Sequence, residues 1–487
     1  MIPQTKAKTQ TQTPLPARGS WLVLAVLLLG QFMCILDVFV VNVAMPSIGT
    51  QLHASGAELQ LIVGAYTIAY AMLLITGARL GDRYGRRRMY LTGVITFTLA
   101  SLACAVAPDS AVLIAARFVQ GAGAAMLVPQ IFSLIQLRFS GRARARALSA
   151  YAAVLSSGAV AGLVLGGIIV SADLLGQGWR PIFAINVPVG AVLGALAPRC
   201  LPVDEPAEAP AEAPAGAVRR LDMRGLAAAA AAVLLLVVPL VLGQQTGWPA
   251  WTYCSLAAGA AIAVLFVRIE RQVARRGGDP LLNLGVLRSP GLPSGLTTLV
   301  LTQVGYGGLL FTFTLYLQAG LGESALRAAL SYLPMSVMFG LAAYCWRRLP
   351  AVLHRDLPAA GLALSGIGYL ALAVAVRHGQ QAPLSAYLAQ TAIGTGLGLS
   401  VGPLLTQSLA RVELARIADA SGLLTTSVQL GQLTGIAALG SVYLALRHSV
   451  HATTAATHAA MTTTSYWLAA LSLAGLATAI ATRRTPH

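Results

Sequence analysis

Runs of about twenty apolar residues recur along nearly the whole 487-residue chain, separated by short polar breaks. An α-helix of that length, rising about 1.5 Å per residue, crosses the hydrocarbon core of a bilayer. With 56% hydrophobic and only 10% charged residues, the chain is too apolar for a water-soluble globular protein. The runs are also too continuous for the alternating strands of a membrane barrel. The sequence therefore predicts an all-α polytopic membrane protein.

The positions of these runs predict fourteen spans in groups of six, two and six. The first six spans are expected at Trp21–Ala44, Leu59–Ala78, Met89–Ala107, Ala111–Leu137, Leu148–Ala172 and Pro181–Pro198. The central pair is expected at Gly225–Leu242 and Trp251–Val267. The last six are expected at Leu292–Leu317, Leu326–Trp346, Pro358–Val376, Leu384–Leu409, Ala418–Leu446 and Thr464–Thr482.

This grouping divides the chain into five parts. We expect an N-terminal tail (1–20), a six-helix bundle (21–200), a linker rich in Pro, Ala and Glu (201–224), two extra helices with a cytoplasmic loop (225–291), and a second six-helix bundle (292–487). The linker composition is typical of extended chain that cannot form a packed core. None of the five parts has the composition of a soluble enzyme domain.

The basic residues predict the orientation of the spans. Of 33 Lys and Arg residues, 28 fall on the side of the membrane that carries the N-terminus, four fall on the opposite side, and Arg117 falls inside a span. Cytoplasmic loops carry an excess of Lys and Arg, so both termini are expected in the cytoplasm. The net charge of +17 is thus a topology signal, because no folded soluble domain presents these residues to a nucleic acid.

The residues present argue against the use of ATP and against several kinds of catalytic or metal site. The only lysines are Lys6 and Lys8, at the extreme N-terminus, so no Walker A loop is present to hold the phosphates of ATP. No HExxH motif occurs, and the five cysteines are scattered without the spacing of a disulfide framework or a zinc site. We expect no enzyme activity, no cofactor, no metal and no use of ATP as an energy source.

One loop carries a specific pattern beyond its positive charge. The stretch Arg79–Arg88 places Asp82, Arg83, Gly85 and Arg86 directly after the second span. Glycine permits a tight turn, and an aspartate can face an arginine or a helix N-terminus. An ordinary cytoplasmic loop would explain the arginines but not this spacing of Asp82 and Gly85.

Two ionisable residues are predicted inside the first bundle. A carboxylate at the centre of a span costs about 2.5–3.5 kcal/mol on insertion scales, so Asp37 should face the bundle interior as a candidate functional residue. Arg117 needs an acidic partner, and Asp37 is the expected one. The alternative is a structural role for Asp37, in an ion pair or a hydrogen bond to Asn42. All seven histidines are expected in loops or the tail, which leaves Asp37, and Glu58 at the rim of the second span, as candidate proton carriers.

The fifth expected span contains glycines at a spacing that brings helix backbones close together. They are Gly158, Gly162, Gly166 and Gly167. Glycines four residues apart lie on one face of a helix, where the absence of a side chain permits close packing. The stretch therefore predicts a tight helix–helix contact.

Four stretches together resemble the major facilitator superfamily, in particular its fourteen-span drug:proton antiporters (EmrB/QacA-like antibiotic exporters). They are Leu36–Pro46, Arg79–Arg88, Arg117–Ala125 and Gly158–Gly167. The resemblance implies two six-helix bundles that rock about a central site, proton coupling by the aspartate and arginine of the first bundle, and a conformational latch in the Arg79–Arg88 loop. The fifth-span stretch departs at Leu163, where the family has proline.

The function implied by this resemblance is proton-coupled efflux of a small drug or antibiotic, which confers resistance or exports a self-made compound. We expect a monomer in the bacterial cytoplasmic membrane. Few carboxylates fall in the spans, so the substrate is expected to be neutral, zwitterionic or anionic. Two alternatives stay open: a proton-coupled uptake permease of the same fold, and a membrane sensor or receptor, which should carry a soluble signalling domain.

Overall fold

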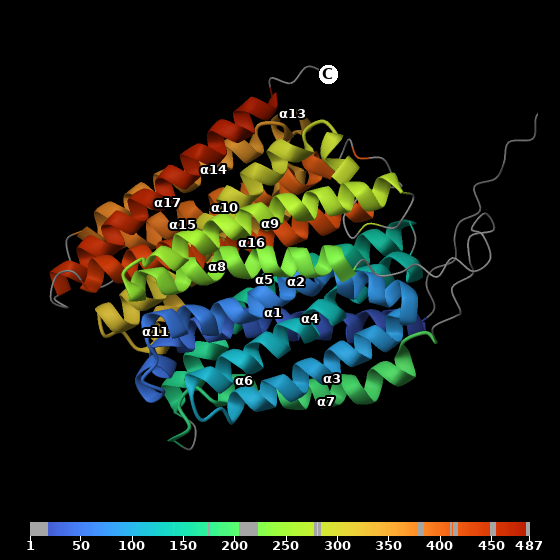
Figure 1. Cartoon of the computed structure of the whole chain (residues 1–487), viewed down its shortest axis with the longest axis horizontal. Helices are drawn as coiled ribbons and strands as arrows, with labels where there is room; N and C mark the ends of the chain where they lie inside the picture. Colours follow the sequence, from blue (N-terminus) through green and yellow to red (C-terminus); the bar gives the residue numbers. More distant parts are fainter. Residues whose placement is uncertain are drawn as a thin grey trace, which may run out of the picture.

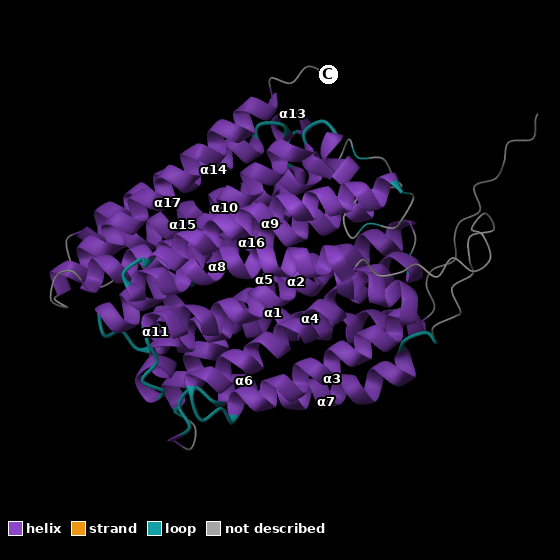
Figure 2. Cartoon of the chain, viewed as in Figure 1, coloured by secondary structure: helices purple, strands orange, loops and turns teal. Residues whose placement is uncertain are grey.

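A computed structural model describes most of the chain, namely residues 18–139, 141–173, 176–203, 223–276, 280, 284–377, 384–409, 412, 417–448 and 454–483. Regular secondary structure in these ranges is helical throughout, as Figure 2 shows. Most of the predicted N-terminal tail (1–20) and most of the predicted linker (201–224) lie outside the described residues.

The first half of the chain forms seven helices. They are α1 (Arg18–Gln51), α2 (Gly56–Tyr84), α3 (Arg86–Ala105), α4 (Ser110–Arg138), α5 (Gly141–Ala172), α6 (Pro181–Ala184) and α7 (Asn186–Cys200). Local sequence explains two of the starts. Ser55 and Glu58 form a capping box at the start of α2, and the Asp109 carboxylate accepts the Val112 N–H at the start of α4.

The second half forms the remaining elements. They are α8 (Met223–Thr246), α9 (Ala250–Arg275), η2 (Leu284–Arg288), α10 (Leu292–Leu315), the π-helical turn η3 (Tyr316–Gly320), α11 (Ala325–Ser331), α12 (Leu333–Cys345), η4 (Trp346–Arg348), α13 (Ala351–His354), α14 (Leu357–Arg377), α15 (Leu384–Leu409), α16 (Ile417–His448) and α17 (Thr454–Arg483). Each apolar run of the sequence therefore lies on one helix or on consecutive helical segments.

Among the described residues, twelve helices are long and apolar enough to cross a membrane. Two further apolar helical stretches, Ser157–Ala172 and Arg224–Leu240, are shorter. The protein is thus a multi-pass membrane protein, while the count of fourteen spans and the location of the termini stay predictions.

Two expected spans are broken, and one starts earlier than expected. The sixth breaks between α6 and α7, and the tenth breaks at Tyr332 between α11 and α12. Each break lies two or three residues before a proline, Pro188 or Pro334, which cannot donate an N–H to the preceding turn. The last helix begins at Thr454 rather than Thr464.

The helices form two bundles, visible in the lower and upper halves of Figure 1. In the first bundle α1 packs against α5, and α4 packs against α2 and α3; in the second, α10 packs against α16, and α14 against α15 and α17. Two main contacts join the bundles, α2 with α16 and α5 with α11. The pair α8–α9 lies across this junction, where α8 contacts both α2 and α16.

Side-chain hydrogen bonds fix α8 in this place. Proline at 239 has no N–H for the Leu235 carbonyl, and the Ser255 hydroxyl of α9 donates to that carbonyl at 2.9 Å. The Ser441 hydroxyl of α16 donates to the Leu240 carbonyl, also at 2.9 Å. Hydrogen bonds therefore join α8 to α9 within the extra pair, and α8 to α16 of the second bundle.

The apolar core differs between the two ends of the molecule. We call the end where α1 finishes and α2 begins (Gln51, Gly56) the outer end, because the charge distribution predicts it to face outside; the opposite end, at Gly85, is the inner end. At the outer end, buried apolar side chains of both bundles form one continuous cluster. At the inner end, the first bundle and the second bundle have separate clusters. The bundles are thus joined at the outer end.

Candidate functional site

Asp37 and Arg117 form a buried ion pair inside the first bundle. The Arg117 Nη1 lies 2.5 Å from the Asp37 Oδ2, and the two side chains are 1% and 0% exposed. Asp37 lies on α1 and Arg117 on α4, so the pair links these two helices through residues that are eighty positions apart in sequence. A buried guanidinium and a buried carboxylate are tolerated when each neutralises the other.

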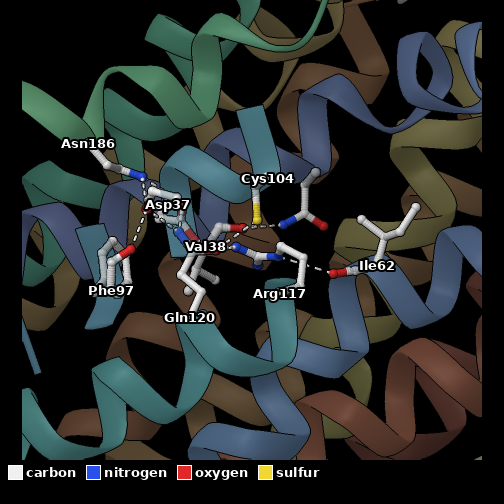
Figure 3. A network of polar contacts seen from close by, with 10 residues as sticks. Asp37, Val38, Ile62, Phe97, Cys104, Arg117, Gln120 and Asn186 are labelled. Atoms are coloured by element: carbon white, nitrogen blue, oxygen red, sulfur yellow. Dashed lines mark hydrogen bonds and ion pairs between the residues drawn. The ribbon is translucent and has the colours of Figure 1, made fainter. Parts of the chain in front are cut away.

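Two amide side chains complete the shell of the Asp37 carboxylate, as Figure 3 shows. Gln120 on α4 donates to the Asp37 Oδ1 at 2.8 Å, and Asn186 on α7 donates to the same oxygen at 2.9 Å. Both amides also donate to the Ser101 hydroxyl of α3, at 2.7 and 3.4 Å. The network thus draws donors and acceptors from four helices, and Asp37 is fully hydrogen-bonded.

Arg117 has further partners that could hold it if Asp37 released it. Its Nε donates to the Ile62 carbonyl of α2 at 3.2 Å, and its Nη1 also donates to the Gln120 Oε1 at 2.5 Å. The guanidinium lies 4.6 Å from the ring centroid of Tyr66 and 5.6 Å from that of Phe183. Aromatic faces attract a cation by about 1–2 kcal/mol each when water is excluded.

The helical arrangement agrees with the protein family whose model this chain matches. Residues 27–436 match the Major Facilitator Superfamily. The chain belongs to this superfamily.

Relatives of this major facilitator carry transport names. It is 36% identical over 437 residues to the probable actinorhodin transporter of Streptomyces coelicolor, covering 89% of this chain and 74% of that protein. It is 34% identical over 422 residues to the cephamycin export protein CmcT of Amycolatopsis lactamdurans, covering 84% and 82%. It is 32% identical over 436 residues to the puromycin resistance protein pur8 of Streptomyces alboniger, covering 88% and 83%.

Solved structures share the fold of this major facilitator. A bacterial homologue of the human lysosomal transporter Spinster, in an inward-facing and unoccupied conformation, superposes with a TM-score of 0.70 at 17% identity, covering 96% of this chain and 98% of that one. The POT family transporter PepTSo gives a TM-score of 0.68 at 16% identity, covering 98% of this chain and 100% of that one. At these identities the likeness is one of fold alone.

Glu58 lies at the start of α2 and is bonded as a helix cap. Its carboxylate accepts the Ser55 N–H and hydroxyl, each at 2.8 Å, and the Ser110 hydroxyl of α4. These described contacts join it to the outer ends of α2 and α4 and not to Asp37. The Asn42 side chain likewise bonds within its own helix, to the Val38 carbonyl at 2.8 Å, rather than to Asp37.

The loop between α2 and α3 turns on one glycine. Gly85 has φ +100°, a conformation that L side chains rarely adopt, and its N–H closes α2 on the Gly81 carbonyl at 3.1 Å. Arg83 lies exposed over the Tyr84 ring, and Arg86 begins α3. The side chain of Asp82 is outside the described part of the chain, so its proposed partner in a latch stays a prediction.

Arginines around this loop contact neighbouring segments. Arg79 donates to the Pro280 carbonyl at 3.0 Å, which connects α2 to the segment after α9. Arg87 donates to the Pro198 carbonyl of α7 at 2.5 Å. The first bond attaches the inner end of α2 to the segment after α9, and the second joins α3 to α7 within the first bundle.

The glycines of α5 face two different neighbours. A Cβ at Gly162 would lie 2.7 Å from the Leu36 carbonyl oxygen, and Gly158 and Gly166 are similarly close to α1. Gly167 instead faces α11 of the other bundle, where a Cβ would lie 2.9 Å from the Leu326 Cα. The glycine face thus packs α5 on α1, and its last member touches the second bundle.

One histidine is not where the sequence predicted it. His458 was expected in a loop, but α17 begins early enough to include it, and its side chain is 7% exposed. Its Nδ1 is 3.0 Å from the Tyr316 hydroxyl. The polar residues of the first-bundle network were also missed, although Gln120 lies one turn from Arg117 and Asn186 lies in an apolar run.

The metal-ligating side chain types are dispersed in the described part of the chain. In that part of the chain, no group of three or more His, Cys, Asp or Glu residues is placed to hold a metal ion. The described cysteines are all free thiols, two of them buried. The site that the described side chains do form is the buried Asp37–Arg117 ion pair with its shell of amides and hydroxyls.

Proposed function

We propose that this protein is a fourteen-span antiporter that exports a small drug or antibiotic across the cytoplasmic membrane in exchange for protons. Relatives of comparable length are named as a transporter of actinorhodin, an exporter of cephamycin and a puromycin resistance protein, which supports an antibiotic-like cargo. The proposed exchange for protons rests on the fully buried Asp37–Arg117 pair.

A proton and Arg117 compete for the same carboxylate. When Asp37 takes up a proton, it no longer neutralises the guanidinium, and a buried charge without a counter-ion is costly. Arg117 must then rely on the Ile62 carbonyl, the Gln120 amide and the Tyr66 face. Protonation thereby changes which partners hold α4 against α1 and α2, which is a local cause for rearranging the bundle.

The packing of the two bundles supports alternating access. A joined core at the outer end and separate cores at the inner end are the features of an inward-facing state. Transport requires the opposite state, in which the outer contacts between α2 and α16 and between α5 and α11 separate. Proton entry from outside and drug release to the outside would then occur in the same conformation.

The same pair favours a substrate without net positive charge. The Asp37 oxygens are taken by three donors and its charge is neutralised by Arg117, so it offers no unpaired carboxylate to a cationic drug. We expect neutral, zwitterionic or anionic compounds to be exported and dications to be excluded. An efflux assay on a panel of antibiotics sorted by charge tests this, and efficient export of dications would contradict it.

Substitution of Asp37 tests the proton coupling. In Asp37→Asn the side chain keeps its size but cannot be ionised, so we expect efflux to lose its dependence on a pH gradient. The measurement is drug accumulation in inside-out vesicles with an acidic interior, after the variant has been shown to insert in the membrane. Wild-type, gradient-driven accumulation by Asp37→Asn would remove Asp37 as the proton carrier.

Glu58→Gln is the matched control for a second proton site. Glutamine also completes a capping box with Ser55, so this variant should fold and retain gradient-driven accumulation. Loss of coupling in folded Glu58→Gln would assign a proton role to Glu58 as well. The same vesicles decide the direction, since an uptake permease would release drug from them and a sensor would move none.

A further inference from the structure

His458 is a buried titratable group that the mechanism above does not use. It lies near the outer end of α17, in the second bundle, with 7% of its surface exposed. Of the other described histidines, His53 is exposed and His354 is half-buried. Histidine is the side chain whose charge changes between about pH 5 and pH 8, so a buried one is a candidate proton-binding group.

The ring is held by one hydrogen bond and lacks another. The Tyr316 hydroxyl lies 3.0 Å from Nδ1, and the two rings meet edge to face at 5.6 Å between centroids. The opposite nitrogen, Nε2, is buried and has no hydrogen-bond partner in the described structure. Since a buried polar atom without a partner is costly, the site is incompletely satisfied in this conformation.

Tyr316 connects this histidine to a contact between the bundles. It is the first residue of η3, the π-helical turn that ends the ninth predicted span. Two residues later, the Gln318 amide donates to the Val43 carbonyl of α1 at 2.7 Å. Arg447 of α16 donates to the Ala319 carbonyl of the same turn at 3.0 Å. A π-helical turn is an irregular element that is frequent at functional sites.

The surroundings of the ring offer no counter-ion for a protonated histidine. Titratable and charged groups at the outer ends of the elements packed on α17 are Tyr316 on η3, Tyr443 and Arg447 on α16, and Arg377 on α14. The nearest described carboxylate along the chain from η3, Glu323, is paired with Arg327 at 3.4 Å. The Val376 carbonyl of α14 faces the ring as the available acceptor.

We propose that His458 is a second proton-binding site, and that its protonation from the outer side favours separation of the two bundles at that end. Neutral His458 has one unsatisfied nitrogen. The protonated ring carries an N–H on both nitrogens and a positive charge. The Val376 carbonyl can accept one N–H, but the groups around the ring supply no counter-ion, so the charged form is favoured where water reaches the ring. Because Tyr316 lies on the turn that bonds to α1, hydration of this site disrupts the Gln318–Val43 contact.

The proposal rests on the proposed proton-coupled export and extends it to the step that opens the outer end. Asp37 and His458 then have different tasks. Protonation of His458 favours the conformation that exposes the transport pathway to external protons, and Asp37 carries the proton that is exchanged for drug. The two sites lie in different bundles, so each can be altered while the other is kept.

The experiment measures the separation of the outer ends directly. Spin labels are attached at Val106 of the first bundle and Leu384 of the second, both exposed at the outer end, and distance distributions are recorded in lipid nanodiscs. Between about pH 8 and about pH 5, the wild-type long-distance population should rise about threefold or more. His458→Gln should abolish that rise, whereas His53→Asn, at an exposed histidine of the same end, should leave it unchanged.

A background with Asp37→Asn separates this proposal from the proposed function. The pH-dependent rise should persist in Asp37→Asn and vanish in Asp37→Asn with His458→Gln. A full rise in the double variant would overturn the role of His458, whatever Asp37 does in transport. Tyr316→Phe, which keeps the ring but removes its hydroxyl partner, should reduce the rise if His458→Gln proves too unstable to measure; a wild-type response in Tyr316→Phe would overturn the link through η3.

Discussion

At the scale of single residues, the first bundle depends on mutual neutralisation. Asp37 and Arg117 are each nearly inaccessible to water, and each would be a costly buried charge without the other. The amides of Gln120 and Asn186 both donate to the other carboxylate oxygen, Oδ1. Removal of one partner therefore affects the protein more than removal of both.

This asymmetry gives a stability prediction. Arg117→Met leaves the Asp37 carboxylate without a counter-ion and should cost about 3–5 kcal/mol. The double variant Asp37→Asn with Arg117→Met should be more stable than Arg117→Met alone. Apparent melting temperatures of the purified variants in detergent provide the comparison.

Arg138→Met is the matched control on the same helix. Arg138 lies exposed at the end of α4, so its loss should change stability by no more than about 0.5 kcal/mol. Equal destabilisation by Arg117→Met and Arg138→Met would show that the buried pair does not hold the bundle together.

Sequence reasoning identified the ionised residues of this site but not the neutral ones. The cost of burying charge is large, so Asp37 in an apolar run predicts both an interior position and an opposite charge nearby. Amides and hydroxyls such as Gln120, Asn186 and Ser101 cost less to bury, and nothing in the sequence alone shows which of them meet. His458 was missed because the residues from Thr454 onward are polar, so the first turns of α17 have the composition of a loop.

At the scale of elements, α5 is placed by its glycines. The face that carries Gly158 and Gly162 lies directly on α1, the helix that bears Asp37. Leu163, at the position where the family has proline, is 1% exposed and belongs to the core at the outer end. The helix is therefore continuous through this stretch and packs along its length.

The glycine contacts predict a graded series of alanine variants. At Gly162 a Cβ would meet the Leu36 carbonyl oxygen at 2.7 Å, and Gly162→Ala should cost about 1–3 kcal/mol by forcing α5 from α1. At Gly158 the nearest atom is a side-chain carbon of Ile35 at 3.0 Å, which can shift, so the loss should be smaller. Thermal unfolding in detergent ranks the variants.

Gly194→Ala on α7 serves as the reference for this series. A Cβ there has no neighbour within 4 Å, and alanine in a helix interior is favoured over glycine by roughly 0.5–1 kcal/mol. This variant should be as stable as the wild type or more stable. A loss at Gly194 equal to that at Gly162 would mean that close packing is not the cause.

The helices themselves were predictable because each apolar run has the length that a bilayer demands. The interruptions within these helices were harder to predict. The breaks at Ile185 and Tyr332 follow from prolines two or three residues later, yet Pro46 and Pro129 lie inside continuous helices. Whether a proline breaks a helix depends on neighbours that resatisfy the freed carbonyl, and these come from elsewhere in the chain.

At the scale of the whole molecule, the outer end holds the two bundles together. The Ser171 hydroxyl of α5 accepts the Leu326 N–H of α11 at 3.0 Å, and Gln318 bonds to α1 close by. If this end must open during transport, a covalent link across it should stop the cycle. Ser171→Cys with Leu326→Cys, in a background without the five native cysteines, provides such a link.

Oxidation of this pair should abolish vesicle transport, and a reductant should restore it. A second pair, Thr298→Cys with Thr478→Cys, joins α10 to α17 within one bundle, where the hydroxyls are 2.8 Å apart, and should leave transport intact when oxidised. Complete cross-linking of the first pair with undiminished transport would contradict a rocking mechanism. Gel mobility reports the extent of cross-linking in both.

The position of α8 gives the molecule two unequal sides within the plane of the membrane. The junction between the bundles has one flank along α2 and α16 and another along α5 and α11. On the α2–α16 flank, α8 contacts both helices and is bonded to α16 through Ser441. It therefore covers this flank of the junction. For an apolar compound dissolved in the leaflet, α8 therefore stands between the lipid and the junction on the α2–α16 flank, whereas among the described elements α8 and α9 have no main contact with α5 or α11.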